Sequence, residues 1–294
     1  MKTYFLIFSV ISLVLTSCKD TNTGNTAVSE EIDSIVFQSG YTMVNGLKMY
    51  YEIYGEGEPM VLIHGGGSDI QTTFGRVIPL LAQHYKLIAV DLQAHGLTGD
   101  RDSDLTFEQD ADDVSALLVN LGIPRAHIFG FSNGGTTAIQ MAIRHPEQVN
   151  KIIAASPLCK RDGVPFMFWE FMRFGTLADM PKQLKESYLQ LTNDSSGLQR
   201  MFDKDSKRMN DFKDIPDESI KAIKAPTLII IGDRDIITPE HAKELNRFIQ
   251  GSELFIFPGE HGKYIREITT IKPDDIKTEF AVIPQIEEFL EKGK

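Results

Sequence analysis

Short apolar runs alternate with amphipathic segments along most of this chain, from about residue 41 onward. Continuous apolar runs bounded by polar or glycine-rich segments are typical of buried parallel strands. Such runs occur at residues 60–63, 87–90, 127–131, 151–155, 227–231 and 253–257. Helical segments separate or follow these runs at residues 73–83, 106–121 and 133–145, from residue 239, and at residues 282–291.

The first strands of the chain have a different pattern. Residues 42–44 and 48–54, joined by Asn45-Gly46, predict an antiparallel hairpin with a type I′ turn. Because the remaining strands alternate with helices, the order predicts an α/β fold. We expect a mostly parallel sheet of about eight strands, with helices on both faces and the hairpin at one edge.

The alternation stops between residues 156 and 221, where the chain is charged, rich in Met and Phe, and helical in period. Open α/β sheets bind ligands at the carboxyl ends of their strands. We therefore expect this insertion to form a helical cap above that edge. Its run at residues 165–174 has the composition of an apolar acyl- or alcohol-binding pocket, but the same residues could simply dock the cap on the main domain.

The first forty residues are distinct from the rest. Lys2 and an apolar stretch over residues 4–15 predict a secretory signal, too short for a stable spanning helix. The stretch ends at Leu15-Thr16-Ser17-Cys18, which resembles the lipobox of bacterial lipoproteins. This resemblance implies a signal peptide over residues 1–17, lipidation of Cys18 and an anchor at a membrane surface. The alternative is an ordinary signal peptide with an incidental cysteine. Residues 18–40 are polar and predict a flexible tether.

Composition narrows the possible functions. With 294 residues and 42% hydrophobic content, the chain can bury one large α/β core or two small domains. A formal net charge of −11 makes nucleic acid an unsuitable partner and gives anionic substrates no help in approaching. Apart from Cys18 the sequence contains one cysteine, Cys159, so acylation of Cys18 would exclude an internal disulfide.

The most informative motif is Gly130-Phe131-Ser132-Asn133-Gly134, between an apolar strand and a helical run. A G-x-S-x-G segment at such a crossing is typical of the nucleophile elbow of serine hydrolases. The turn holds the serine in a strained conformation with its hydroxyl projecting from the sheet. Side chains at the two glycine positions would collide with neighbouring backbone. The helix that follows points its N-terminal N–H groups at the reacting atom.

Three further motifs follow predicted strands. The first is His64-Gly65-Gly66-Gly67, whose glycines allow backbone N–H groups to approach a substrate oxygen. The second is Gly232-Asp233-Arg234-Asp235, an acidic turn, and the third is Gly259-Glu260-His261-Gly262. Of the seven histidines, His261 alone combines glycine neighbours with a preceding strand. We expect a supporting role for His64 in the glycine loop and structural roles for His84, His127, His145 and His241.

Together, these motifs resemble the α/β-hydrolase superfamily over residues 41–294, in particular its serine esterase and haloperoxidase-like branch with a helical cap. The resemblance implies a core domain of residues 41–156 and 222–294, with the cap at residues 157–221. It also implies a catalytic triad of Ser132, Asp235 and His261, in the chain order of this superfamily. Asp235 is favoured over Asp233 because the family pattern G-D-x-D-x-x-x-P places the acid at the second aspartate. The backbone N–H groups of Gly66 and Asn133 would form the oxyanion hole.

The sequence departs from the family in two places. Gln93 and Ala94 replace the arginine and first glycine of the D-x-R-G-x-G-x-S segment that begins at Asp91. The segment at residues 263–280, after His261, is longer than a minimal fold needs, and predicts either a flap at the pocket rim or a surface loop.

The resulting hypothesis is a serine hydrolase that cleaves small or medium, mainly apolar carboxylic esters through an acyl-enzyme, anchored in the bacterial cell envelope and facing the periplasm or the exterior. Its partners would be a small-molecule substrate and, through Cys18, a membrane; the oligomeric state stays open. Neither a metal nor an organic cofactor is implied. The same triad could serve an amide or peptide hydrolase, a carbon–carbon bond hydrolase, a lactonase or a haloperoxidase-like perhydrolase. Outside enzymes, the fold could act as a ligand-binding protein.

Overall fold

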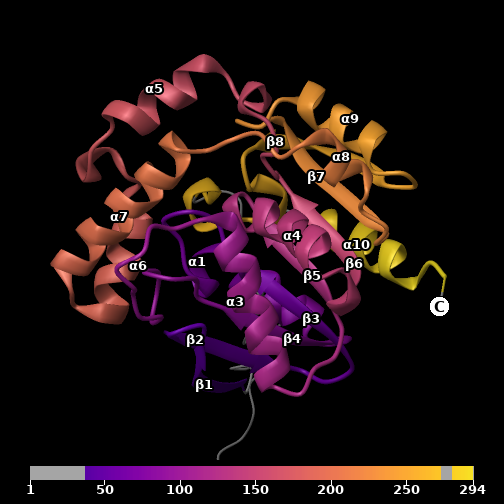
Figure 1. Cartoon of the computed structure of the whole chain (residues 1–294), viewed down its shortest axis with the longest axis horizontal. Helices are drawn as coiled ribbons and strands as arrows, with labels where there is room; N and C mark the ends of the chain where they lie inside the picture. Colours follow the sequence, from indigo (N-terminus) through magenta and orange to yellow (C-terminus); the bar gives the residue numbers. More distant parts are fainter. Residues whose placement is uncertain (1–36, 273–279, 294) are drawn as a thin grey trace, which may run out of the picture. The chain divides into compact units, whose positions relative to one another are not determined.

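A computed structural model describes residues 37–272 and 280–293 of the chain. Its centre is an eight-stranded sheet with the order β1-β2-β4-β3-β5-β6-β7-β8 (Figure 1). The strands β3 to β8 run parallel to one another, whereas β2 pairs antiparallel with both β1 and β4. Their bounds are β1 Phe37–Val44, β2 Leu47–Tyr54, β3 Glu58–Ile63, β4 Tyr85–Val90, β5 Ala126–Phe131, β6 Val149–Ala155, β7 Thr227–Arg234 and β8 Glu253–Glu260. The predicted α/β fold and its antiparallel edge hairpin are confirmed.

Helices cover both faces of the sheet because the side chains of each buried strand alternate between two cores. Val61 and Ile63 of β3 pack in one core with α3 (Phe107–Asn120), α4 (Asn133–Arg144) and α9 (Pro239–Phe248). Met60 and Leu62 of the same strand pack in the other core with α10 (Val282–Glu291) and the two short helices α1 and α2. The sheet is therefore apolar on both sides, as its continuous hydrophobic runs predict.

The helix predicted at residues 73–83 is wrong in detail, since two short helices occupy that region. The first, α1 (Ile70–Phe74), begins earlier because Asp69 caps it and ends at Gly75. The second, α2 (Ile78–Leu81), carries Pro79 in its first turn, where the missing N–H costs nothing. By contrast, α3 begins as predicted, with the Thr106 side chain accepting from the N–H of Gln109.

The described structure begins inside the segment predicted as a tether. Residues 37–40 belong to β1 and pair with β2, with Phe37 opposite Tyr54 and Gly40 opposite Tyr51. The predicted tether therefore ends at least four residues too late, because the edge of β2 offers residues 37–40 backbone partners. The predicted signal and Cys18 lie outside the described residues. Within the described ranges, we find no helix with the length and apolar character needed to cross a membrane.

The cap forms between β6 and β7. Its helices are α5 (Phe166–Phe174), α6 (Lys182–Thr192) and α7 (Ser195–Asn210), which lie together on one side of the structure (Figure 1). The helices α6 and α7 share a small apolar cluster that includes Leu184, Leu198 and Met201, whereas α5 packs against the main core through Phe168 and Met172. The next helix, α8 (Asp217–Lys221), buries Ile220 in the main core. The longer inserted helices thus end at Asn210, before the predicted boundary at residue 221.

Candidate active site

Ser132 lies at the turn between β5 and α4, at the carboxyl edge of the sheet. Its backbone has φ 56° and ψ −119°, a conformation that L-amino acids rarely adopt. The turn is tight because a Cβ at Gly130 would lie 1.9 Å from the carbonyl oxygen of Gly134, and one at Gly134 would lie 2.0 Å from that of Ile63. Glycine is therefore required at both positions, as the motif predicts.

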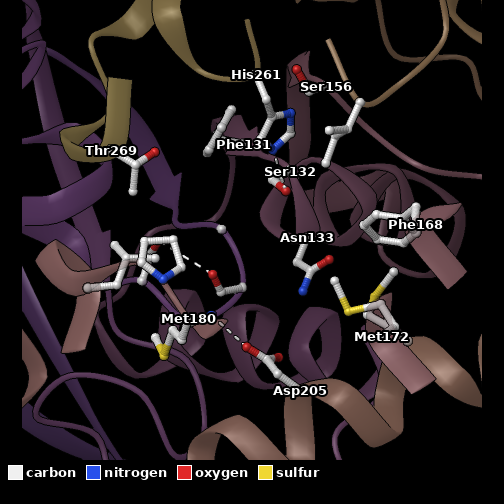
Figure 2. A pocket seen from close by; sticks show the side chains of 18 of the residues that line it. Phe131, Ser132, Asn133, Ser156, Phe168, Met172, Met180, Asp205, His261 and Thr269 are labelled. Carbon is white, nitrogen blue, oxygen red and sulfur yellow. Dashed lines mark hydrogen bonds between the residues drawn. The ribbon is translucent and has the colours of Figure 1, made fainter. Parts of the chain in front are cut away.

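His261 connects Ser132 with Asp235. Its Nε2 lies 2.9 Å from the Ser132 hydroxyl (Figure 2). Its Nδ1 lies 2.6 Å from Asp235 Oδ1. The ring also packs against Phe131, with ring centroids 4.7 Å apart. The three predicted triad residues, separated by up to 129 positions in the chain, thus form one continuous hydrogen-bonded line.

The Asp235 carboxylate is buried and has several donors besides His261. The N–H of Ile237 donates to Oδ1 at 3.0 Å, while the N–H of Gly232 at 3.1 Å and the hydroxyl of Ser156 at 2.6 Å donate to Oδ2. Burial alone would raise the pKa of Asp235, but the charge of His261 and these hydrogen bonds lower it below its ordinary value. Asp235 therefore stays ionised beside His261.

Asp233, the other acidic candidate, has a different position. Its side chain is about half exposed and accepts a hydrogen bond from the N–H of Gly259 at 2.8 Å. This contact ties the turn after β7 to the end of β8. Asp233 is thus a structural hydrogen-bond partner, which agrees with the preference for Asp235.

The glycine loop after β3 lies directly beside the elbow. A Cβ at Gly66 would lie 2.4 Å from the amide nitrogen of the Asn133 side chain, so the loop and the helix start are in close contact. His64 supports this loop, since its Nδ1 donates to the carbonyl of Gly65 at 2.7 Å and its Nε2 accepts from the N–H of Leu92 at 3.0 Å. Burial lowers the pKa of His64 to about 3, so its ring is neutral. The predicted supporting role of His64 is confirmed.

A cavity of about 290 Å³ opens above Ser132, between the sheet edge and the cap. Figure 2 shows Phe168 and Met172 on one side of Ser132 and Asn133, with Met180 and Thr269 on the other. Most of the lining side chains are apolar; they include Phe131, Leu158, Phe168, Phe171, Met172, Met180, Leu184, Phe202, Met209, Ile236 and Ile237. A ligand at Ser132 would be surrounded by apolar groups with few polar ones.

The aromatic run at residues 165–174 fulfils both of its predicted roles. Phe168 and Met172 line the cavity and also pack against the main core. Trp169 docks the helix, stacking on Phe212 and donating from Nε1 to the carbonyl of Arg161 at 2.9 Å. The remaining face of α5 leaves four large side chains exposed: Phe166, Met167, Phe171 and Phe174.

The segment after His261 belongs to the rim of the cavity. Glu267 and Thr269 line the cavity, while Tyr264 and Ile265 are buried in the core below. The described part of this segment, residues 263–272, therefore matches the flap prediction better than the surface loop. Residues 273–279 lie outside the described residues.

Within the described ranges, one group of side chains has the chemistry to hold a metal ion. It consists of Asp162, His241 and Glu244. The N–H of Cys159 donates to His241 Nε2 at 3.1 Å, which requires that nitrogen to be unprotonated. Because burial lowers the pKa of His241 to about 4, the ring is neutral and carries its proton on Nδ1. That nitrogen is the one facing Glu244, at 3.9 Å. A protonated nitrogen cannot bind a metal, so we assign no metal to this cluster.

Comparison with known proteins agrees with this geometry. A family model described as alpha/beta hydrolase fold matches residues 58–213, more than half of the chain. The AB hydrolase superfamily protein YisY of Bacillus subtilis (strain 168) is 30% identical over 246 residues, covering 74% of this chain and 90% of that protein. The chain belongs to the alpha/beta hydrolase family. It is accordingly an enzyme of the hydrolase class.

Two more distant α/β hydrolases illustrate the range of the family. Human serine hydrolase BPHL is 27% identical over 243 residues, which are 78% of this chain and 81% of that protein. The crystal structure of the enol-lactonase from Burkholderia xenovorans LB400 superposes with a TM-score of 0.65 at 21% identity, covering 85% of this chain and 99% of the lactonase. At that identity the lactonase likeness concerns the fold alone.

Several residues at the site had no recognised signal in the sequence. Ser156 follows the carboxyl end of β6, an informative position, yet nothing in its neighbours indicates a contact with Asp235. Tyr264 lies 2.6 Å from the Ser156 hydroxyl, and Asp205 reaches the glycine loop from the cap. These contacts join segments up to 138 residues apart, and local pattern cannot predict them.

Proposed function

We propose that this hydrolase cleaves small or medium, neutral, mainly apolar carboxylic esters through an acyl-enzyme. The observation that carries the proposal is the hydrogen-bonded line of Ser132, His261 and Asp235 at the floor of an apolar cavity. A serine hydroxyl is a poor nucleophile unless a base takes its proton. His261 is within hydrogen-bond distance of that proton and is oriented by an ionised carboxylate.

The reaction follows from these positions. Ser132 attacks the ester carbonyl carbon while its proton moves to His261 Nε2. The N–H groups of Gly66 and Asn133 bind the oxyanion. His261 then protonates the leaving alkoxide, which departs as the alcohol. A water molecule, deprotonated by His261, attacks the acyl-enzyme and releases the acid and free Ser132.

The substrate class follows from the lining of the cavity. Apolar side chains on both sides of Ser132 favour apolar acyl or alcohol groups, since each buried methylene contributes about 0.8 kcal/mol. The carboxylate of Asp205 lines the cavity, and the net charge of the chain is −11. Both disfavour ester substrates that carry a free carboxylate group. A lipid on Cys18 and the segment at residues 18–36 would hold the enzyme at a membrane of the bacterial cell envelope, which we propose from the lipobox-like segment alone.

The test compares the wild-type protein with S132A on p-nitrophenyl acetate and butyrate. We expect S132A to lose turnover by at least about 10³-fold, because the nucleophile is absent. A fluorophosphonate probe should label the wild-type protein and leave S132A unlabelled. Equal rates for the two proteins would exclude the mechanism, and an unreactive wild-type serine would favour a binding protein.

Mass spectrometry of the mature protein tests the lipid on Cys18.

A further inference from the structure

We infer that Asp205, on the cap helix α7, is a positioning residue that holds the glycine loop of the active site in its working conformation. The inference rests on the proposed function, because it concerns the backbone that would bind the oxyanion. It assigns a role to the cap beyond enclosing the substrate. When α7 packs against the core, its Asp205 also fixes the backbone that would form the oxyanion hole.

A single oxygen of Asp205 contacts the loop. Oδ2 accepts from the N–H of Gly67 at 2.5 Å and lies 2.9 Å from His95 Nε2. A Cβ placed on Gly66 would lie 3.2 Å from the same oxygen. Asp205 also lines the cavity below Asn133 (Figure 2). This carboxylate therefore contacts the loop at the residue next to the proposed oxyanion donor.

His95 supports Asp205 from the core. Its Nδ1 lies 2.8 Å from the carbonyl of Gln93 and donates to it, so Nε2 must also carry a proton to bond Asp205. Burial alone would lower the pKa of His95, but the charge and hydrogen bond of Asp205 raise it. His95 lies in the segment that departs from the family pattern, where Gln93 and Ala94 replace the usual residues.

Arg208 fixes Asp205 from the other side. It pairs with Oδ1 of Asp205 and, at 2.7 Å, with Asp110 of α3, and its side chain is 2% exposed. Burial alone would raise the pKa of Asp205, but the charges of Arg208 and His95 hold it well below its ordinary value. Asp205 is therefore an ionised acceptor held in place from both α7 and the core, the condition for an effective preorganised contact.

The loop needs such a contact because three consecutive glycines have little conformational preference. Within the described residues, the N–H of Gly67 has side-chain acceptors only in Asp205 and, at 3.2 Å, His95. Because His95 Nε2 carries a proton and donates to Asp205, it cannot accept, and Asp205 is the acceptor for this N–H. Without Asp205, the peptide between Gly66 and Gly67 could rotate, and the Gly66 N–H would leave the position needed in the transition state.

The experiment measures kcat and KM separately for D205A, D205N and one control, with p-nitrophenyl butyrate as the substrate. The control is D203N, which changes an exposed carboxylate on the same helix. We expect D205A to lower kcat at least about tenfold with KM changed less than about threefold, because the loss concerns the transition state. D205N should fall between D205A and wild type, since its amide oxygen can still accept from Gly67. The D203N control should keep kcat within about threefold.

The inference is overturned if D205A retains wild-type kcat, if only KM rises, or if D203N lowers kcat as much as D205A. If D205A does not fold, the isosteric D205N decides: an unchanged kcat contradicts the inference, and a reduced kcat with normal KM supports it. If wild type does not turn over the ester, the proposed function fails on its own. In that case the same variants are compared by their rates of fluorophosphonate labelling, because that reaction also produces an oxyanion beside Ser132.

Discussion

The hydroxyl of Ser156 lies 2.6 Å from Oδ2 of Asp235, whereas His261 contacts the other carboxylate oxygen. Because Ser156 gives its single proton to Asp235, the neighbouring Tyr264 hydroxyl, also at 2.6 Å, must be the donor to Ser156. Burial raises the pKa of Tyr264 well above its ordinary value, so it keeps this proton. A chain of donors therefore leads from Tyr264 through Ser156 to Asp235, the carboxylate that also contacts His261.

We expect S156A to lower both stability and activity. The lost hydrogen bond to a buried carboxylate is worth about 1.5–3 kcal/mol, part of which orients His261. The free energy of unfolding should fall by that amount in urea titrations, and kcat for p-nitrophenyl butyrate by about tenfold. Y264F is the matched control: it leaves the Ser156–Asp235 bond intact and should change kcat less than S156A does. A wild-type kcat in S156A would contradict the role of this hydrogen bond.

The elbow glycines should not tolerate a methyl group. In G134A the new Cβ would lie 2.0 Å from the carbonyl oxygen of Ile63, so β3 and the elbow would have to separate. We expect a loss of about 3 kcal/mol or more in unfolding free energy, together with loss of fluorophosphonate labelling. G99A is the control, because its nearest contact would be an ordinary 3.5 Å from the Lys48 carbonyl. Similar stability of the two variants would show that the elbow is looser than described.

Shortening Phe168 should extend the range of accepted acyl chains. Phe168 closes one side of the cavity, and F168A would open space there for additional methylenes. At about 0.8 kcal/mol per methylene, kcat/KM for longer esters should rise by up to about fourfold per added methylene relative to wild type. The measurement is a series of p-nitrophenyl esters from acetate to octanoate. L191A, an exposed position on α6, serves as the control. An unchanged chain-length profile would mean that acyl chains occupy the opposite side, near Met180.

The pair of His95 and Asp205 should make stability depend on pH. The folded-state pKa of His95 is raised, so its contribution is complete below about pH 6.5 and is lost as pH rises through the raised value. The pKa of Asp205 is lowered, so its contribution is present above about pH 4 and is lost as pH falls through the lowered value. The neighbouring His64 stays neutral over this range, because burial lowers its pKa to about 3.

The difference in unfolding free energy between wild type and D205N should therefore be largest between about pH 4 and 6.5 and should shrink at higher pH. Urea unfolding of both proteins at several pH values measures this difference. Comparing the two proteins cancels titrations that they share, such as that of Asp91, whose pKa burial raises to about 7. A difference that grows toward pH 9 would contradict the assignment of a protonated His95.

Much of the fold could be predicted from the chain itself, because its buried strands are continuous apolar runs and its turns use residues with strong preferences. Asn45-Gly46 specifies the hairpin, and Thr106 caps α3. The errors occur where local preference is weak. Residues 37–40 look like a tether but extend β1 because β2 offers backbone partners, and Gly75 divides a helix that the apolar pattern predicts as continuous.

The motifs of the sequence and the family that they resemble predicted that Ser132, Asp235 and His261 lie together, since each follows a strand and parallel strands bring those ends to one edge. The need for glycine on either side of Ser132 could also be predicted, since glycine allows the neighbouring backbone segments to approach closely. Only the tertiary structure decided that Ser156 and Tyr264 support Asp235, that Asp205 reaches Gly67 from the cap, and that α5 both lines and encloses the cavity. Such contacts depend on how the cap helices pack across the edge of the sheet. That packing is set by side-chain shape and charge between distant segments, which have no periodic signature along the chain.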